Sequence, residues 1–168
     1  GRTCFKMELL DLYDINGNLT GKTVVRGTSF TNGYIKLAVI IIQNKNGDYL
    51  LEKSSFEKGG YYSFIGGHVK HSEDSLTAIL RETNEEVELL LEKDELQFVG
   101  QFKHFNRPCL IDLYKLKKDL DLKTLVIQPE EVEKILLVSS TFLDELIASE
   151  QFLPFHARVY IEYKNSDR

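Results

Sequence analysis

The sequence predicts a single α/β domain. Strand-like and helix-like segments alternate along its 168 residues, and no linker or internal repeat divides them. Ile35 to Gln43 is a β-branched, apolar run that is typical of a buried strand. Residues 74–89 instead carry apolar side chains at three- to four-residue spacing, which indicates an amphipathic helix.

The first half of the chain is predicted to form strands that polar turns separate. The pairs Asn16-Gly17 and Asn46-Gly47 are strong turn signals. The second pair is expected to join residues 35–43 and 48–53 as a hairpin. The strands expected in this half are residues 8–13, 19–26, 35–43, 48–53 and 61–65.

The second half is predicted to add helices to further strands. Ser72 or Asp74 can cap the first helix, Ser139 or Ser140 the second, and Pro154 is tolerated in the first turn of the last. The expected strands are 96–105, 109–116 and 135–138, and the expected helices are 74–89, 141–149 and 154–163. The apolar stripe of the first helix consists of Leu76, Ile79, Leu80, Thr83 and Val87.

Composition argues against several classes of partner. A formal net charge of -5 does not favour nucleic-acid or anionic-membrane binding through a basic surface. Cys4 and Cys109 are the only cysteines, so no disulfide framework is implied. The longest wholly apolar run, Leu37 to Ile42, is far too short to span a bilayer. We expect a cytoplasmic protein with no nucleic-acid or membrane partner.

The domain is expected to cover residues 7–168. Residues 1–6 precede the only methionine, Met7, and we expect them to be an expression remnant or a disordered start.

Three carboxylates share one face of the helix expected at 74–89. Glu82, Glu85 and Glu86 stand at i, i+3 and i+4, so they project from one turn. They repel one another at neutral pH unless a cation lies among them, and carboxylate oxygens suit Mg²⁺ or Mn²⁺. A solvated acidic helix face is the alternative interpretation of the three glutamates taken alone.

Neighbouring residues favour the metal interpretation. Arg81 lies four residues before Glu85, and Glu73 is placed to hold the Arg81 guanidinium through a bidentate contact. Gly66 and Gly67 are predicted to end the strand-like run and to let backbone groups approach a metal or a phosphate.

Together these residues resemble the Nudix box, G-x5-E-x7-R-E-U-x-E-E-x-G-U, in which U is a bulky aliphatic residue. The matching positions are Gly67, Glu73, Arg81, Glu82, Glu85, Glu86 and Leu89. Thr83 replaces the first aliphatic residue, and Glu88 replaces the glycine that closes the helix in the family. Because glycine suits a left-handed closing position, we expect the helix to run on by a turn at Glu88 or to end there with strain.

Flanking segments extend the resemblance over nearly the whole chain after residue 7, toward the branch related to isopentenyl diphosphate isomerase. These segments are Glu8–Asp14 with Asn16-Gly17, Leu50–Ser54, Gly66–Val69 and Gln128–Val132. The resemblance implies an α/β/α sandwich around a mixed β-sheet. The isomerases carry a cysteine immediately before the box glycine, and Gly66 stands there in this chain, so isomerase activity is not expected. Many members of the family are dimers, which leaves a homodimer open.

The resemblance also implies metal-dependent hydrolysis of a diphosphate linkage to a group X, by attack of water at phosphorus. By position in the box, the metal ligands would be Glu82, Glu85, Glu86 and the Gly66 carbonyl, with Mg²⁺ or Mn²⁺ as cofactor. Arg81 and Glu73 would orient these carboxylates. Glu85 is the first choice for the base that activates water.

The sequence does not settle which residues contact the substrate or which residue adds a further metal ligand. Lys53, Gly67 and His68 are expected to contact a small-molecule diphosphate, although Lys53 could instead belong to a solvated loop and His68 could bond to backbone. Acidic residues outside the box that could add a ligand are Glu130, Glu131, Glu133 and Asp112. A non-catalytic sensor of nucleotides or diphosphates is the alternative function, and the identity of X is not encoded in the box.

Overall fold

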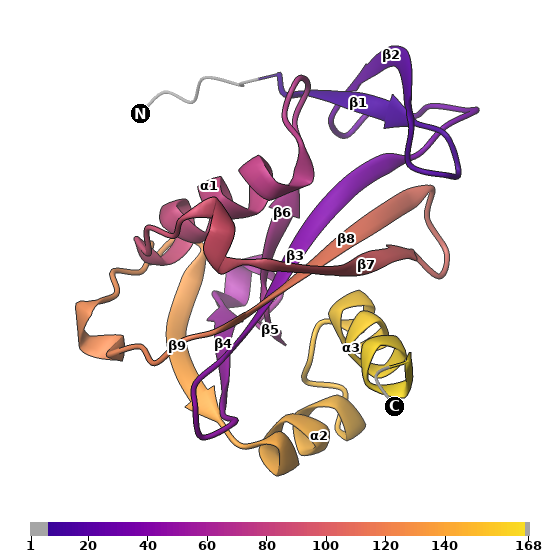
Figure 1. Ribbon diagram of the computed structural model, residues 1–168. Helices are drawn as coiled ribbons and strands as arrows, with labels where there is room; N and C mark the ends of the chain where they lie inside the picture. Colours follow the sequence, from indigo (N-terminus) through magenta and orange to yellow (C-terminus); the bar gives the residue numbers. More distant parts are fainter. Residues whose placement is uncertain (1–6, 167–168) are drawn as a thin grey trace.

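The computed structural model describes residues 7–166 as a sheet covered by helices on both faces (Figure 1). Helix α1 (Ser75–Val87) lies on one face, and α2 (Ser140–Ala148) and α3 (Pro154–Ser166) lie on the other. The predicted α/β/α sandwich around a mixed sheet is therefore confirmed. The expected remnant or disordered start at residues 1–6 lies outside the described residues.

The sheet is centred on β3 (Ile35–Gln43), at the residues that the sequence predicts. β3 pairs in parallel with β8 (Cys109–Lys117) along its whole length, and β8 pairs antiparallel with β7 (Gln97–Lys103). Both faces of β3 are buried, because Val39 and Ile41 pack toward α2 and α3 while the alternate residues pack toward α1. This burial on both faces explains the continuous apolar run.

The expected hairpin between residues 35–43 and 48–53 exists only at its turn. β3 pairs with β4 (Tyr49–Ser54) at Gln43 and Tyr49 alone, because β6 (Ile65–His68) occupies the position beside β3 further along. The other partners of β4 are β5 (Tyr62–Ser63) and β9 (Val132–Val138). β3 and β4 therefore diverge, with β6 beside β3 and β5 beside β4.

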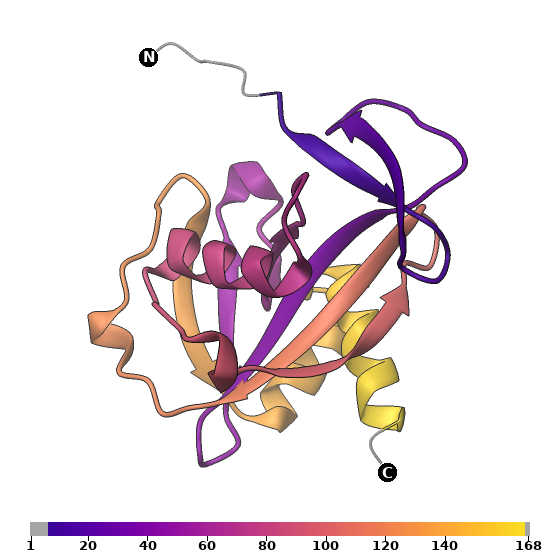
Figure 2. The ribbon, with the colours of Figure 1, turned by 45° about the horizontal axis from the view of Figure 1, so that its top comes forward.

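The first two strands form a separate antiparallel sheet, which lies at one end of β3 (Figure 2). β1 (Leu9–Tyr13) and β2 (Leu19–Val25) lie where the sequence predicts them and are joined by the expected turn. In that turn Asp14 Oδ1 accepts hydrogen bonds from the backbone N–H groups of Asn16 and Asn18.

Helix α1 is slightly shorter than predicted. The Asp74 side chain caps it by accepting a 2.8 Å hydrogen bond from Thr77 N. The helix stops at Val87, and Glu88 adopts a left-handed conformation with φ of 52°. The expectation of strain at Glu88 is therefore met, whereas the alternative of an added turn is wrong. Thr83 is buried, and its hydroxyl donates to the Ile79 carbonyl at 2.7 Å, so its polar group is satisfied within the helix.

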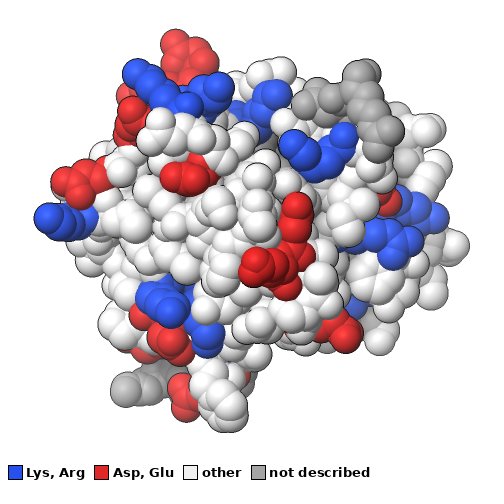
Figure 3. All heavy atoms as spheres, turned by 90° about the horizontal axis from the view of Figure 1, so that it is seen from below, with Lys and Arg blue, Asp and Glu red and all other residues white. Residues whose placement is uncertain are grey.

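The remaining elements differ from the prediction mainly in length. β9 begins three residues earlier than expected because Val132 packs inward, and α3 continues beyond residue 163 to Ser166. The short connecting 3-10 helices are η1 (Phe56–Lys58), η2 (Lys93–Glu95) and η3 (Leu122–Thr124). No helix in residues 7–166 combines the length and apolar character that a membrane crossing needs. The face shown in Figure 3 carries small, separate groups of acidic and basic side chains.

Candidate active site

A cavity of about 1250 Å³ is lined by residues of β3, β4, β6 and α1, among other segments, and charged residues line much of it. Its acidic lining residues are Glu8, Glu52, Glu82, Glu85, Glu86 and Glu131. Its basic lining residues are Arg26, Lys58, Lys70, Arg81 and Arg107. The structure thus brings the three predicted carboxylates of α1 into one cavity, together with carboxylates from other elements.

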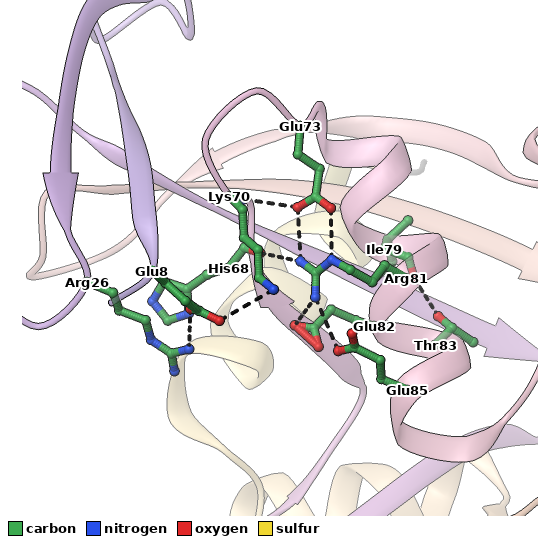
Figure 4. Close-up of polar contacts among 10 residues, drawn as sticks. All are labelled: Glu8, Arg26, His68, Lys70, Glu73, Ile79, Arg81, Glu82, Thr83 and Glu85. Atoms are coloured by element: carbon green, nitrogen blue, oxygen red, sulfur yellow. Dashed lines mark hydrogen bonds and ion pairs between the residues drawn. The ribbon is translucent and has the colours of Figure 1, made fainter. Parts of the chain in front are cut away.

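Arg81 is the centre of a hydrogen-bond network at the edge of this cavity (Figure 4). Its Nε and Nη2 donate to the two Glu73 carboxylate oxygens at 2.8 and 2.9 Å, which is the predicted bidentate contact. The same guanidinium donates to the His68 carbonyl at 3.1 Å and to Glu85 Oε1 at 3.2 Å. Arg81 therefore links the β6 end, the loop that carries Glu73 and the acidic face of α1.

Glu73 is held as a carboxylate by this network. Burial alone would raise its pKa, but hydrogen bonds from Arg81 and from the Lys70 backbone N–H outweigh burial and lower that pKa. A permanently charged Glu73 fixes Arg81, and Arg81 in turn directs the Glu85 carboxylate.

The glycine pair lies inside β6, so the prediction that it ends a strand is wrong. Gly66 and Gly67 pair with Val39 and Ala38 of β3. A side chain at Gly67 would collide with the Glu82 carboxylate, and a Cβ at Gly66 would lie 2.8 Å from the Ala38 carbonyl oxygen. The two glycines are therefore required for close approach rather than for a turn, and Gly67 lets Glu82 lie directly against the strand.

Glu52 of β4 is a site residue that the sequence analysis missed. It is 5% exposed, and its carboxyl group lies within hydrogen-bonding reach of the Glu86 carboxyl group. Glu52 Oε2 is buried and has no hydrogen-bond partner. Burial and the proximity of Glu52 raise the pKa of Glu86 to about 11, and burial likewise raises the pKa of Glu52. Without a cation, these two groups share protons instead of ionising together.

Glu82 belongs to the same buried cluster. Burial raises its pKa to about 7, against the opposing effect of Arg81 and with a further increase from Glu85. Glu85 is more exposed, with half of its side chain accessible to solvent. The cluster thus contains the buried Glu52 and the partly buried Glu82 and Glu86, with Glu85 exposed at its rim.

A sequence signal for Glu52 existed in the alternation of β4. Residues two apart on a strand share a face, so Glu52 follows Leu50 into the layer beneath α1. Lys53 must then point to the other face, where its Nζ lies 3.4 Å from Glu133 Oε1 and over the Tyr62 ring. Lys53 does not line the cavity, so its predicted substrate contact is not supported; Lys58 lines the cavity and pairs with Glu131 at 3.6 Å.

The four acidic residues proposed from outside the box are placed differently by the structure. Glu131 lines the cavity and raises the pKa values of Glu52 and Glu86 through its charge. Glu130 and Glu133 do not line it. Asp112 is also outside the lining, and one of its oxygens lies 3.3 Å from Lys36 Nζ.

The two histidines beside the glycine pair have separate surroundings. His68 lines the cavity, and burial, with Arg26 nearby, lowers its pKa to about 4, which keeps the ring neutral. His71 lies outside the cavity lining, and its Nδ1 is 2.7 Å from Asp11 Oδ1. His68 is therefore the histidine of this pair that can contact a bound molecule.

The chemistry of the cluster fits a divalent cation. Within residues 7–166, no three His, Cys, Asp or Glu side chains already converge as a ready-made metal centre. The carboxyl groups of Glu52, Glu82 and Glu86 nevertheless all have raised pKa values, because burial, complete only at Glu52, disfavours their charged form, and Glu52 Oε2 lacks any partner. A cation that replaces their protons would satisfy these oxygens, and all-oxygen ligand sets suit Mg²⁺ or Mn²⁺.

Comparison with known proteins places this site in a family. The NUDIX domain model matches residues 34–160. A Nudix hydrolase of Listeria innocua is 30% identical over 166 residues, which cover 95% of this chain and 97% of that protein. A Nudix hydrolase of Listeria monocytogenes is 29% identical over 154 residues, which cover 89% and 90%.

Solved structures agree with this assignment at the level of the fold. The DR0079 protein of Deinococcus radiodurans superimposes with a TM-score of 0.77 at 16% identity, over 96% of this chain and 100% of that chain. The MutT protein of Methanosarcina mazei Go1 gives a TM-score of 0.64 at 18% identity, over 83% and 99%. The chain therefore belongs to the Nudix hydrolase family, whose enzymes are pyrophosphohydrolases.

Proposed function

We propose that this Nudix hydrolase cleaves the diphosphate linkage of a nucleoside diphosphate-X, or of a related organic diphosphate, with Mg²⁺ or Mn²⁺ as cofactor. The observation that carries the proposal is the carboxyl cluster of the buried Glu52 with the partly buried Glu82 and Glu86. Glu52 is buried with an oxygen that has no partner, and Glu82 and Glu86 are partly buried beside it, an arrangement that is costly without a further cation and is expected where a divalent ion binds. The cavity beside them has room for an organic diphosphate.

The metal ion would be held by Glu82 and Glu86 together with Glu52, which joins the predicted ligands from the opposite side of the cluster. The predicted roles of Glu85 and of the Gly66 carbonyl as ligands stay open. When bound, the ion would supply charge neutralisation for the diphosphate oxygens and would lower the pKa of a bound water.

The protein's own residues would orient and activate the reactants. Glu73 fixes Arg81, and Arg81 holds Glu85 through Oε1 at the cavity rim. Glu85 is our candidate base, because its half-exposed carboxylate can accept a proton from water that enters the cavity. The water oxygen then forms a bond to one phosphorus as the bridging P–O bond breaks, and the leaving phosphoryl group departs with the bridging oxygen.

Substrate contacts would come from Gly67, His68 and Lys58. Lys58 takes the role that the sequence analysis gave to Lys53, because it lies in the cavity lining and Lys53 does not. The resemblance to the isopentenyl diphosphate isomerase branch is retained as a resemblance only, since Gly66 stands where the isomerases carry cysteine. The proposal includes a cytoplasmic location and a small-molecule partner, and a homodimer stays open.

A hydrolysis panel tests this function. Each compound of the panel is incubated with Mg²⁺ or Mn²⁺. The panel contains nucleoside triphosphates, nucleotide sugars, dinucleoside polyphosphates, coenzyme A and isoprenoid diphosphates. We expect metal-dependent turnover of at least one compound, reduced about 100-fold or more by Glu86→Gln. Glu130→Gln is the matched control, because Glu130 is exposed outside the cavity lining.

The contrary result would be ligand-dependent thermal stabilisation without turnover of any compound. That outcome would favour a sensor of nucleotides or diphosphates over a hydrolase.

A further inference from the structure

His156 is a buried polar residue of α3 that the mechanism above does not use. It is 4% exposed, and its ring packs against aromatic neighbours. The Phe64 ring stacks on it with centroids 6.1 Å apart and an interplanar angle of 17°, and the Phe155 ring meets it edge-on at 4.4 Å. The position and orientation of the imidazole are therefore fixed by packing.

The hydrogen bonding of His156 fixes which nitrogen carries the proton. The backbone N–H of Phe64 donates to His156 Nδ1 at 3.2 Å, so Nδ1 must be the unprotonated acceptor. Burial lowers the pKa of His156 to about 3, which keeps the ring neutral. A neutral imidazole whose Nδ1 accepts must carry its proton on Nε2, and Nε2–H can only donate.

The Nε2–H group faces the cavity. A Cβ built on Gly66 would lie 3.5 Å from Nε2, and both residues line the cavity. Within residues 7–166, the side-chain hydrogen bond of His156 is the one at Nδ1, so Nε2–H is available to donate. Nε2 is not one of the fully buried side-chain atoms without a partner, which within residues 7–166 are Glu52 Oε2 and Asp112 Oδ1, so it keeps contact with the cavity. A molecule bound in the cavity can therefore supply its acceptor.

This donor and the carboxyl cluster lie on opposite faces of β6. Successive residues of a strand alternate between faces, so Gly66 meets His156 while Gly67 meets Glu82. His156 is therefore positioned to contact the part of the substrate that extends away from the carboxylates proposed to bind metal.

The surroundings of His156 are apolar and aromatic. Its ring neighbours include Phe64 and Phe155, and burial is the only cause that shifts its pKa, with no contribution from a nearby charge. A phosphate placed there would lose its hydration without gaining a counter-ion. The matching acceptor is an uncharged oxygen or nitrogen.

We propose that His156 Nε2–H donates a hydrogen bond to an uncharged oxygen or nitrogen acceptor on group X, and so helps to select X. This inference rests on the proposed function, because it places the diphosphate at the carboxyl cluster and X on the other side of β6.

Steady-state kinetics of two His156 variants test the contact, with the panel compound that is turned over fastest. His156→Phe keeps an aromatic ring but removes the donor, and we expect KM to rise on the order of tenfold with kcat within about threefold. His156→Gln carries an N–H at a similar reach and is expected to recover most of the affinity. Tyr160→Phe is the matched control on α3, since it removes a buried hydrogen bond to Tyr49 outside the cavity lining and should leave KM unchanged.

A KM that stays the same in His156→Phe while the melting temperature falls would overturn the proposal and leave His156 a purely structural residue. A second measurement covers the case in which His156→Phe does not fold. In wild-type protein labelled with ¹⁵N-histidine, the Nε2–H proton should shift downfield and exchange more slowly with water when the methylene-bridged analogue of the same compound binds. An unchanged resonance in the saturated complex would also overturn the proposal.

The two proposals fail separately. If a panel compound stabilises the protein without being hydrolysed, the hydrolase proposal fails, and the same titration with that compound still tests the His156 contact. If no compound is turned over or bound, both proposals fail.

Discussion

The carboxyl groups of Glu52 on β4 and Glu86 on α1 meet inside the cavity within hydrogen-bonding reach of each other. Their meeting depends on the divergence of β3 and β4, because β6 separates the two strands beyond Gln43 and Tyr49. Two acids that cannot both ionise side by side form a site where, in the proposed function, a cation would replace protons.

The pH dependence of stability follows from Glu82. Its pKa in the folded protein is about 7, above the usual value of 4.5, so the folded state holds a proton that the unfolded state releases. That contribution to stability is complete below pH 4.5 and is lost as the pH rises toward 7. Without metal, the free energy of unfolding should therefore fall more steeply from pH 5 to pH 7.5 in wild type than in Glu82→Gln, measured by urea denaturation. Parallel profiles would contradict this account.

Gly67→Ala should disable the site with little effect on the rest of the fold. The new methyl group would collide with the Glu82 carboxylate and push it out of the cluster. We expect metal affinity and kcat each to fall about 10- to 100-fold, as measured by calorimetry and by the panel assay. Gly100→Ala is the matched control in β7, because its added Cβ would meet no atom closer than 3.8 Å and should leave both quantities unchanged.

Arg81→Lys should weaken the orientation of the acidic face while preserving charge. A lysine cannot reproduce the two parallel hydrogen bonds to Glu73 together with the contacts to the His68 carbonyl and Glu85. We expect kcat to fall about 10- to 100-fold. Glu73→Gln should give a similar loss, and the double variant should lose little more, because both residues act through one network. Fully additive losses would show that Arg81 and Glu73 act independently.

Glu88→Gly should stabilise the protein. Glu88 closes α1 with φ of 52°, a conformation that costs a non-glycine residue about 1 kcal/mol relative to glycine. The expected gain is about 1 kcal/mol in the free energy of unfolding, or roughly 2–4 °C in melting temperature for a chain of this size. Asn84→Gly, placed inside the helix, should instead destabilise by roughly 0.3–0.5 kcal/mol, because asparagine is itself a weak helix former. A loss of stability in Glu88→Gly would mean that this side chain has a role that outweighs the strain.

The sequence was most informative where local patterns decide structure. The apolar run Leu37–Ile42 predicted the central strand Ile35–Gln43 to the residue, because burial on both faces of its middle part favours apolar side chains there. The spacing of Glu73 and Arg81 predicted their contact correctly, since the cap at Asp74 and one helix bring them together.

Sequence was less informative where distant segments meet. Glu52 was missed because its partner Glu86 becomes a neighbour only through the sheet topology. Lys53 was assigned to the site, although the alternation of side chains along β4 directs it to the face opposite Glu52. The glycine pair was predicted to end a strand, because sequence does not show that the Glu82 carboxylate and the Ala38 carbonyl fill the space beside it. The hydrogen bond from the Phe64 backbone N–H to His156 likewise joins residues far apart in the chain, so the sequence does not predict it.

The central claim is that a divalent ion replaces protons in the carboxyl cluster. It is tested most directly by calorimetric titration of Mn²⁺ at pH 7 in two buffers with different ionisation enthalpies, which reports the protons released per ion bound. The account predicts release of about one proton or more from wild type, because burial and the adjacent Glu52 raise the pKa of Glu86 far above its usual value, and a clearly smaller release with weaker binding in Glu52→Gln. Absence of binding, or binding without proton release, would contradict it.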